Sequence, residues 1–223
     1  MDQYILHLET ATKVCSVALS KNGSLVSVKE TQEDGYAHGE NLNVFIQDVL
    51  AQAKITIKEL TAISVASGPG SYTGLRIGAA TAKSLCYSIG IPLIAVDALT
   101  SLAEIALLKH FNINLCALID ARRMEVYNLI LDRNLDSQKT ITADVIDENS
   151  YEEYLPFVYF GDGAQKLEEI WKGRDCLLDS TIKSSAIGQV RLAFLKFQNN
   201  EFEDVAYWEP FYLKDFIAGK KAK

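Results

Sequence analysis

The sequence is poor in the residues that build metal sites and disulfide frameworks. Its 223 residues include four cysteines, three histidines and four prolines. No two cysteines have CxxC spacing, and no two histidines lie within one helical turn of each other, so the HExxH and HxxxH patterns are absent. We therefore expect no metal site and no disulfide scaffold, and the scattered cysteines are typical of small buried residues in a reducing compartment.

Long apolar runs and a basic charge balance are also missing. No run is long enough to cross a bilayer, and the first eight residues lack the pattern of a secretory signal. We expect a cytoplasmic protein with no membrane partner. The 22 basic and 29 acidic residues give a net charge of −7, which argues against a protein that grips a nucleic acid backbone alone.

What is present is a regular alternation of strand and helix patterns. Three short strands, at 4–9, 14–20 and 25–30, open the chain, and Asn22-Gly23 predicts a tight hairpin between the last two. Apolar residues at helical spacing predict a helix over 39–53. Thr56 and Glu59 form a short capping box before a buried strand that ends at Ser67.

A second helix is predicted up to about Ile89, then a strand over 92–96 and a third helix capped by Asp97. The pattern then restarts with strands at 115–120, 125–131 and 157–160, followed by helices at 164–172 and 185–197. This weak duplication predicts an α/β protein with a duplicated actin-like, ribonuclease H-like fold, as in the actin, hexokinase and heat-shock-chaperone superfamily. We place the two lobes at residues 1–109 and 110–223.

The most distinctive segment is GPGSYTGLRIG, residues 68–78. One interpretation is an anion- or nucleotide-binding loop, with free N–H groups at a helix N-terminus. The other, equally supported, is a tight strand-to-helix turn with close helix packing, for which glycine is needed. Arg76 pairs either with an anion or with a neighbouring acid. The candidate loop residues are Gly68, Gly70, Ser71, Thr73, Gly74 and Arg76.

An acid ends the first strand of each half, and an arginine pair follows the second of these acids. Glu9 and Asp120 occupy positions that, in an actin-like fold, face the cleft and hold nucleotide-bound magnesium. The segment after Glu9 lacks the glycine that would let the backbone approach a phosphate, so we favour a satisfied acid at a strand end. Arg122-Arg123 is interpreted as a solvated hairpin turn, with an anion- or partner-binding role as the minor alternative.

Four segments together resemble the TsaB (YeaZ) family. They are ILHLETATKVCSVAL, HGENL, GPGSYTGLRIG and DARRMEVY. Two further segments, FGDGA and EPFYLKDF, resemble the family more weakly. Lys214 stands where the family commonly has Arg, and Glu9 stands where many members have Asp. The resemblance implies an actin-like paralogue of the catalytic subunit TsaD that has no catalytic residues of its own. It would be required for threonylcarbamoyl modification of the tRNA adenosine beside the anticodon.

The resemblance also implies how the protein works with partners. It would dock on the TsaD-like subunit through its first two helices, be joined by a TsaE-like ATPase, form a homodimer when isolated, and meet tRNA only through the complex. It implies no cofactor of its own, with ATP or ADP and metal confined to partner subunits or the complex interface. We expect the docking residues to be Leu42, Val44, Phe45, Ile46, Val49, Tyr72, Leu75, Gly78, Ala79 and Ala82.

Rival interpretations remain for this sequence. The apolar stripe on the first helix is typical of a core as well as of an interface. An active enzyme, either a glycoprotease-like metallopeptidase or a small-molecule kinase, would need metal ligands or a phosphate loop in each half. A purely homodimeric interaction protein would use the same helices.

Overall fold

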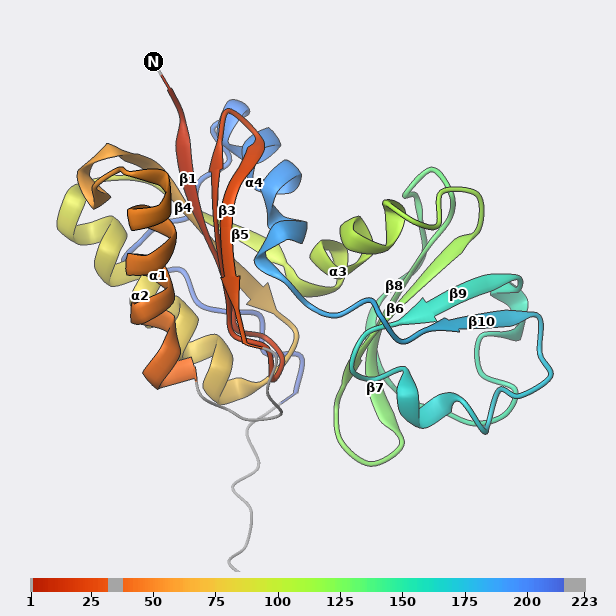
Figure 1. Cartoon of the computed structure of the whole chain (residues 1–223). Coiled ribbons are helices and arrows are strands. Elements are labelled where there is room, and N and C mark those ends of the chain that lie inside the picture. The colour runs from red at the N-terminus through yellow and green to blue at the C-terminus, as the bar shows by residue number, and fades with distance from the viewer. Residues whose placement is uncertain (1, 32–37, 215–223) are drawn as a thin grey trace, which may run out of the picture.

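The computed structural model describes residues 2–31 and 38–214, which form two lobes, each built on a five-stranded sheet (Figure 1). The first sheet has the order β3-β2-β1-β4-β5. Its strands are β1 (Tyr4–Glu9), β2 (Ser16–Lys21), β3 (Ser24–Glu30), β4 (Leu60–Gly68) and β5 (Leu93–Asp97). The first three strands pair antiparallel, and β4 and β5 add parallel to β1.

The second sheet repeats the first strand for strand. It has the order β10-β9-β6-β7-β8, in which β6, β7 and β8 correspond to β1, β2 and β3. Its strands are β6 (Asn114–Asp120), β7 (Glu125–Leu131), β8 (Ser137–Val145), β9 (Phe157–Phe160) and β10 (Cys176–Asp179). The predicted duplicated actin-like architecture is therefore confirmed.

The turn and capping motifs that were predicted for the first lobe both form in the structure. Asn22 and Gly23 both have positive φ, 51° and 77°, which suits the tight hairpin between β2 and β3. The backbone N–H of Thr56 donates to Glu59 Oε2 at 2.7 Å, so the capping box forms at the 3₁₀ turn η1 (Ile57–Glu59). Each motif stabilises a turn that leads the chain into the next strand of the sheet.

In the described part of the chain, four α-helices cover the sheets: α1 (His38–Ala53), α2 (Tyr72–Ile89), α3 (Ala98–Leu107) and α4 (Gln189–Gln198). Helix α3 begins at Asp97, whose Oδ1 accepts from the Thr100 N–H at 2.7 Å. Helix α2 ends at Gly90, which adopts the left-handed conformation with φ of 70°. Among the described residues, no helix combines the length and apolar character needed to cross a bilayer.

The helices form layers on both faces of the first sheet (Figure 1). Helices α1 and α2 pack on one face, with Leu42, Val49 and Ala82 in the shared core. Helix α4 covers the opposite face, where Ala193 packs on Ile5. Helix α3 lies between the lobes and packs on the second sheet through apolar residues such as Leu99 and Leu102. The two lobes therefore share buried apolar surface.

Two elements of the second lobe differ from the sequence-based expectation. The predicted helix over 164–172 is wrong, because this segment forms only the 3₁₀ turn η3 (Gln165–Leu167) followed by turns. The indole of Trp171 is buried there and donates to Asp147 O at 3.1 Å, which anchors the segment without a continuous helix. Strands β8 and β10 were not predicted, since both are edge strands whose residues are mostly polar or half-exposed.

The predicted lobe boundary also needs correction. A second lobe of 110–223 would include α4, but α4 packs on β1, β4 and β5 of the first sheet. After α4, the chain stays with the first lobe: the Glu203 N–H donates to Leu93 O at 2.9 Å and the Phe211 N–H donates to Ser67 O at 2.7 Å. The first lobe is therefore assembled from both ends of the described chain, a long-range arrangement that local sequence patterns do not reveal.

The start of α2 packs directly on the backbone of residues 10–12, and we expect glycine there to be essential for stability. A Cβ at Gly74 would lie 2.0 Å from Thr10 O, whereas a Cβ at Gly39 would meet no described atom within 4 Å. Gly74→Ala should lower the free energy of unfolding by roughly 1–3 kcal/mol or more. Gly39→Ala, the control in α1, should leave it unchanged or raise it by up to about 1 kcal/mol. Urea titrations of both variants measure this; equal effects would contradict the packing explanation.

Candidate functional site at the cleft between the lobes

A cleft of about 770 Å³ opens where the two lobes face each other. One wall comes from the loop after β1 and the segment that leads into α2. The other comes from the β6–β7 hairpin and the turn after β9, and residues 211–214 border both. The lining residues include Lys13, Gly70, Ser71, Tyr72, Thr73, Asp120, Arg122, Arg123, Glu125, Tyr127, Asp162, Tyr212 and Lys214. Its volume falls in the range of small-molecule sites.

The glycines of the 68–78 segment are explained by close backbone packing. A Cβ at Gly70 would lie 2.2 Å from Ala11 O, and one at Gly78 would lie 2.4 Å from Thr10 Oγ1. Gly68 has φ of 106°, a conformation that other residues rarely adopt. The turn interpretation thus accounts for these glycines, and Gly68 and Gly74 do not line the cleft.

The first N–H groups of this segment are used within the protein. The Ser71 N–H donates to Ala11 O at 2.6 Å, and the Gly74 N–H donates to Ser71 Oγ at 3.3 Å. Ser71 is therefore the N-cap of α2. The guanidinium of Arg76 lies 4.4 Å from the centre of the Tyr72 ring in a cation–π contact, and no acid of the described residues lies within salt-bridge distance of it. Of the candidate loop residues, Gly70, Ser71 and Thr73 line the cleft.

Arg122 and Arg123 line the opposite wall, in the tight turn between β6 and β7. Both have positive φ, 72° and 52°, which is uncommon for residues with side chains. The Arg122 N–H donates to Asp120 Oδ1 at 3.1 Å, so the carboxylate that ends β6 holds the turn. Sequence reasoning favoured a merely solvated hairpin; the structure places this exposed hairpin on the cleft.

The acids near these arginines are already paired with lysines. Lys166 forms an ion pair with Asp120, and Lys214 forms one with Glu125. Within the described part of the chain, Lys13, Arg122 and Arg123 have no acidic partner within salt-bridge distance. Asp162 also lines the cleft, and its carboxyl interacts electrostatically with Lys13, so the cleft carries both cationic and acidic side chains.

Glu9 does not reach the cleft, because it is buried with an exposed fraction of 1%. Its Oε1 accepts from the Ala11 N–H at 2.8 Å, and its Oε2 lies 3.4 Å from Gln189 Nε2. Burial away from water raises the pKa of this carboxyl to about 7, and those two hydrogen bonds oppose the rise. The predicted satisfied acid is what the structure shows at Glu9.

A network of buried, hydrogen-bonded side chains extends from Glu9 across the first sheet. The Gln189 amide donates to Leu8 O at 2.9 Å, and its Oε1 accepts from Ser64 Oγ at 2.7 Å. Ser64 Oγ is then free to accept from His7 Nδ1 at 2.7 Å, which leaves His7 Nε2 to accept from Ser20 Oγ at 2.8 Å. Complete burial lowers the pKa of His7 to about 3, so the imidazole is neutral.

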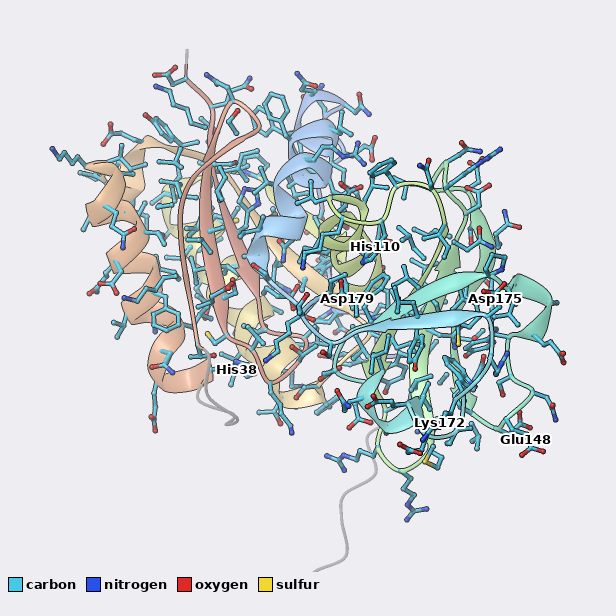
Figure 2. The ribbon with its side chains drawn as sticks, turned by 45° about the vertical axis from the view of Figure 1, so that its right-hand side comes forward. His38, His110, Glu148, Lys172, Asp175 and Asp179 are labelled. Atoms are coloured by element: carbon cyan, nitrogen blue, oxygen red, sulfur yellow. The ribbon has the colours of Figure 1, made fainter. Side chains whose placement is uncertain are left out.

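The other two histidines also have structural contacts, far from each other (Figure 2). His38 Nε2 lies 2.8 Å from Thr12 O at the start of α1. His110 Nε2 lies 2.8 Å from Asp179 Oδ2 and ties the end of α3 to β10. Among residues 2–31 and 38–214, no three His, Cys, Asp or Glu residues gather as metal ligands would.

Most of the predicted docking residues lie in the core, which corrects their assignment to a docking surface. The buried members are Leu42, Phe45, Ile46, Val49, Leu75, Gly78, Ala79 and Ala82. The physical reason is that α1 and α2 need this stripe to cover the first sheet. Val44 is exposed, with an exposed fraction of 51%, and Tyr72 is half-buried against Tyr212 at 5.0 Å between ring centres.

Comparison with known proteins now identifies the family. The family model described as "TsaD: tRNA N6-adenosine threonylcarbamoyltransferase" matches residues 32–215. The Bacillus subtilis tRNA threonylcarbamoyladenosine biosynthesis protein TsaB is 31% identical over 164 residues, 70% of each chain. This chain belongs to the TsaB (YeaZ) family.

Further relatives extend the similarity over the whole length. The Escherichia coli protein of the same description is 27% identical over 226 residues, 97% of each chain. The solved structure of YeaZ from Pseudomonas aeruginosa aligns with a TM-score of 0.81 at 25% identity, covering 95% of this chain and 100% of that one. The family therefore shares both lobes and their arrangement.

The buried carboxyl of Glu9 should make stability depend on pH. Its pKa is raised in the folded state, so the folded state holds a proton that the unfolded state releases above pH 4.5, the ordinary value. The Glu9 carboxyl makes its full contribution to the free energy of unfolding below pH 4.5. This contribution, at most roughly 3 kcal/mol, is lost as the pH rises to about 7. His7 contributes the opposite slope between about pH 3 and 6.5, because its pKa is lowered.

Comparison of the parent with Glu9→Gln cancels the shared contribution of His7. The glutamine side chain of the variant has no proton to lose, so the stability of the variant relative to the parent should increase between pH 5 and pH 8. Urea unfolding at several pH values across this range gives the difference directly. A difference that stays constant with pH would show that Glu9 is not buried as an acid.

Proposed function

We propose that this chain acts in tRNA threonylcarbamoyladenosine biosynthesis as a subunit without chemistry of its own, which docks on a TsaD-like transferase. Its place in this pathway follows from the family to which it belongs. The observation that carries the docking role is the surface formed by α1 and α2. The two helices lie side by side on one face of the first lobe (Figure 1), and nothing described covers their outer side chains.

This surface has the form of a shallow groove between small side chains. The groove, of about 290 Å³, is lined by Asn43, Ala80, Thr81, Ser84 and Leu85. Val44 and Tyr87 project beside it, with exposed fractions of 51% and 85%. Small residues let a partner helix approach closely, and large exposed side chains can anchor it. We call the groove residues together with Val44 and Tyr87 the helix-pair surface.

The polar residues of the chain support a non-catalytic role. All three histidines make structural hydrogen bonds at separate places, and Glu9 is sealed beneath the 10–12 backbone. At the cleft, Asp120 and Glu125 are bound to lysines. None of these groups is arranged as a nucleophile beside a base.

We further propose that nucleotide and metal chemistry belong to the partners. We propose that a TsaE-like ATPase joins the assembly, and that tRNA meets this chain only within it. When the chain is isolated, the helix-pair surface of a second copy would substitute for the transferase. Elemental analysis of untagged protein should find less than one equivalent of any transition metal.

Reconstitution tests the absence of catalysis. The purified chain alone should neither hydrolyse ATP steadily nor modify tRNA, whereas adding it to the TsaD-like subunit, the ATPase and threonylcarbamoyl-adenylate should restore modification. Glu9→Gln and Asp120→Asn should keep modification within a few-fold of the parent. Loss of activity in a variant that still folds and still binds the transferase would overturn the proposal.

A charge placed on the helix-pair surface should abolish docking. Val44→Lys suits α1, because Glu40 and Asp48 lie one turn on either side and accommodate a lysine. Ala80→Arg places a large cation at the groove. Each change would remove an added charge from water on binding and should weaken affinity for the transferase at least about tenfold. Ala79 is unsuitable for this test, since it is buried.

Val145→Lys is the matched control on the second lobe. Val145 lies at the end of β8 with an exposed fraction of 76%, so it receives the same charge without touching the helix-pair surface. It should bind the transferase like the parent. Thermal melting confirms that all variants fold, and calorimetry measures affinity. Parental affinity in Val44→Lys and Ala80→Arg would place the docking surface elsewhere.

A further inference from the structure

We propose that the docking surface continues beyond α1 and α2 onto residues 203–211, and that Tyr207 in this segment contacts the transferase. We call residues 203–211 the strap. This extension of the surface rests on the proposed docking role and adds to it an element from the C-terminal part of the described chain. The anchoring of the strap, its exposed side chains and its charge support a contact with the partner.

The strap is fixed to the first lobe at both ends. From the end of α4 the chain crosses this lobe to α2 (Figure 1). The Glu203 N–H donates to Leu93 O of β5 at 2.9 Å, and the Phe211 N–H donates to Ser67 O of β4 at 2.7 Å. Between these points, Trp208 packs against the apolar core beneath α1 and α2. A segment held in this way loses little conformational freedom when a partner binds to it.

Lys83 of α2 sets where the middle of the strap lies. Its Nζ donates to Ala206 O at 3.2 Å and to Trp208 O at 2.8 Å, the two carbonyls that flank Tyr207. Tyr87 follows Lys83 one helical turn later, so the two tyrosines belong to neighbouring parts of one surface. Both have an exposed fraction of 85%, above that of any other large hydrophobic side chain in the described residues.

The order of residues around α2 connects the strap with the groove. Each residue of a helix is turned by about 100° from the one before it. Going round α2 from the groove, Ala80 is therefore followed by Tyr87 and then by Lys83, which holds the strap. A partner that fills the groove and covers Tyr87 would reach Tyr207 next. Tyrosine is enriched among the side chains that contribute most to binding at protein interfaces.

Charge indicates the chemistry of the partner face. From residue 199 to residue 213 the chain has four acids and no lysine or arginine. The acids are Glu201, Glu203, Asp204 and Glu209.

The two helices do not cancel this charge. Helix α1 has two acids and no lysine or arginine, and one of the acids, Asp48, pairs with Lys29 of β3. Helix α2 contributes Arg76, which stacks on Tyr72, and Lys83, which the strap carbonyls occupy. The combined surface is therefore acidic around a centre of small and aromatic residues. The complementary transferase face carries lysine or arginine around an apolar centre.

Calorimetry with the TsaD-like subunit tests the contact at Tyr207. Tyr207→Ala should weaken affinity about tenfold or more, because it removes a large side chain that the partner would bury. Tyr207→Gln, a second variant at this exposed position, should do the same. Phe111→Ala is the matched control, since Phe111 has an exposed fraction of 64% and follows α3, beside the contact of His110 with β10. It should bind like the parent.

Reversal of one strap charge tests the chemistry of the partner. Glu209→Lys should weaken affinity about two- to fivefold, and added salt should weaken binding by the parent more than binding by this variant. Glu148→Lys is the control, because Glu148 is exposed on the second lobe (Figure 2). Equal effects of the two reversals would show that the strap does not face a basic surface.

Lys83 is a positioning residue, and its variants separate position from charge. Lys83→Met removes both hydrogen bonds to the strap and should weaken affinity about threefold or more. Its loss of a positive charge would by itself strengthen binding to a basic face. Lys83→Arg should restore most of the affinity, because a guanidinium can donate to both carbonyls. Unchanged or tighter binding by Lys83→Met would overturn the role assigned to Lys83.

The variants also distinguish this extension from the docking role itself. Thermal melting checks that each variant folds. Loss of affinity in both Tyr207 variants, with parental binding in Phe111→Ala, supports the contact. Parental affinity in the Tyr207 variants together with loss in Ala80→Arg would overturn the extension and leave the docking role in place. Parental affinity in the Tyr207 variants and in Ala80→Arg would overturn both.

Discussion

The close approach of α2 to the backbone after β1 is the constraint on which the first lobe depends. Gly70, Gly74 and Gly78 line the side of the segment that faces Thr10 and Ala11, and a Cβ at any of them would lie 2.0–2.4 Å from an oxygen atom. This contact sets the height of α2 on the sheet, which in turn sets the groove between α1 and α2. It also closes the backbone over Glu9, so one packing contact shapes both the core and the outer surface.

A network of buried side-chain hydrogen bonds accompanies this apolar packing. Glu9, Gln189, Ser64, His7 and Ser20 are joined by hydrogen bonds that run across the first sheet. Gln189 comes from α4, near the end of the chain, and its amide reaches Leu8 O on β1. Because an unpaired polar group would be costly in this interior, the network specifies how α4 docks on the sheet. It therefore helps to return the C-terminal part of the chain to the first lobe.

The two lobes share one topology but differ in the features that they expose. In the first lobe, α1 and α2 leave an exposed face beside a groove of small residues. In the second lobe, the hairpin equivalent to β1–β2 carries Arg122 and Arg123 and faces the cleft. Helix α2 contributes to both features, because its first turn lines the cleft through Tyr72 and Thr73 and its later turns line the groove.

Local sequence patterns determined most of the strands, the helices and the duplication. The Asn22-Gly23 turn, the Asp97 cap and the apolar stripe from Leu42 to Leu50 each depend on residues that are close together in the sequence. They can therefore be recognised from the sequence alone. The absence of histidine pairs was equally visible. Only the tertiary structure decided that this stripe is core, that Arg122 and Arg123 line a cleft and that α4 belongs to the first lobe. These features depend on contacts between residues far apart in the chain, such as Gln189 with Leu8, and burial is set by what packs on a helix rather than by its own periodicity.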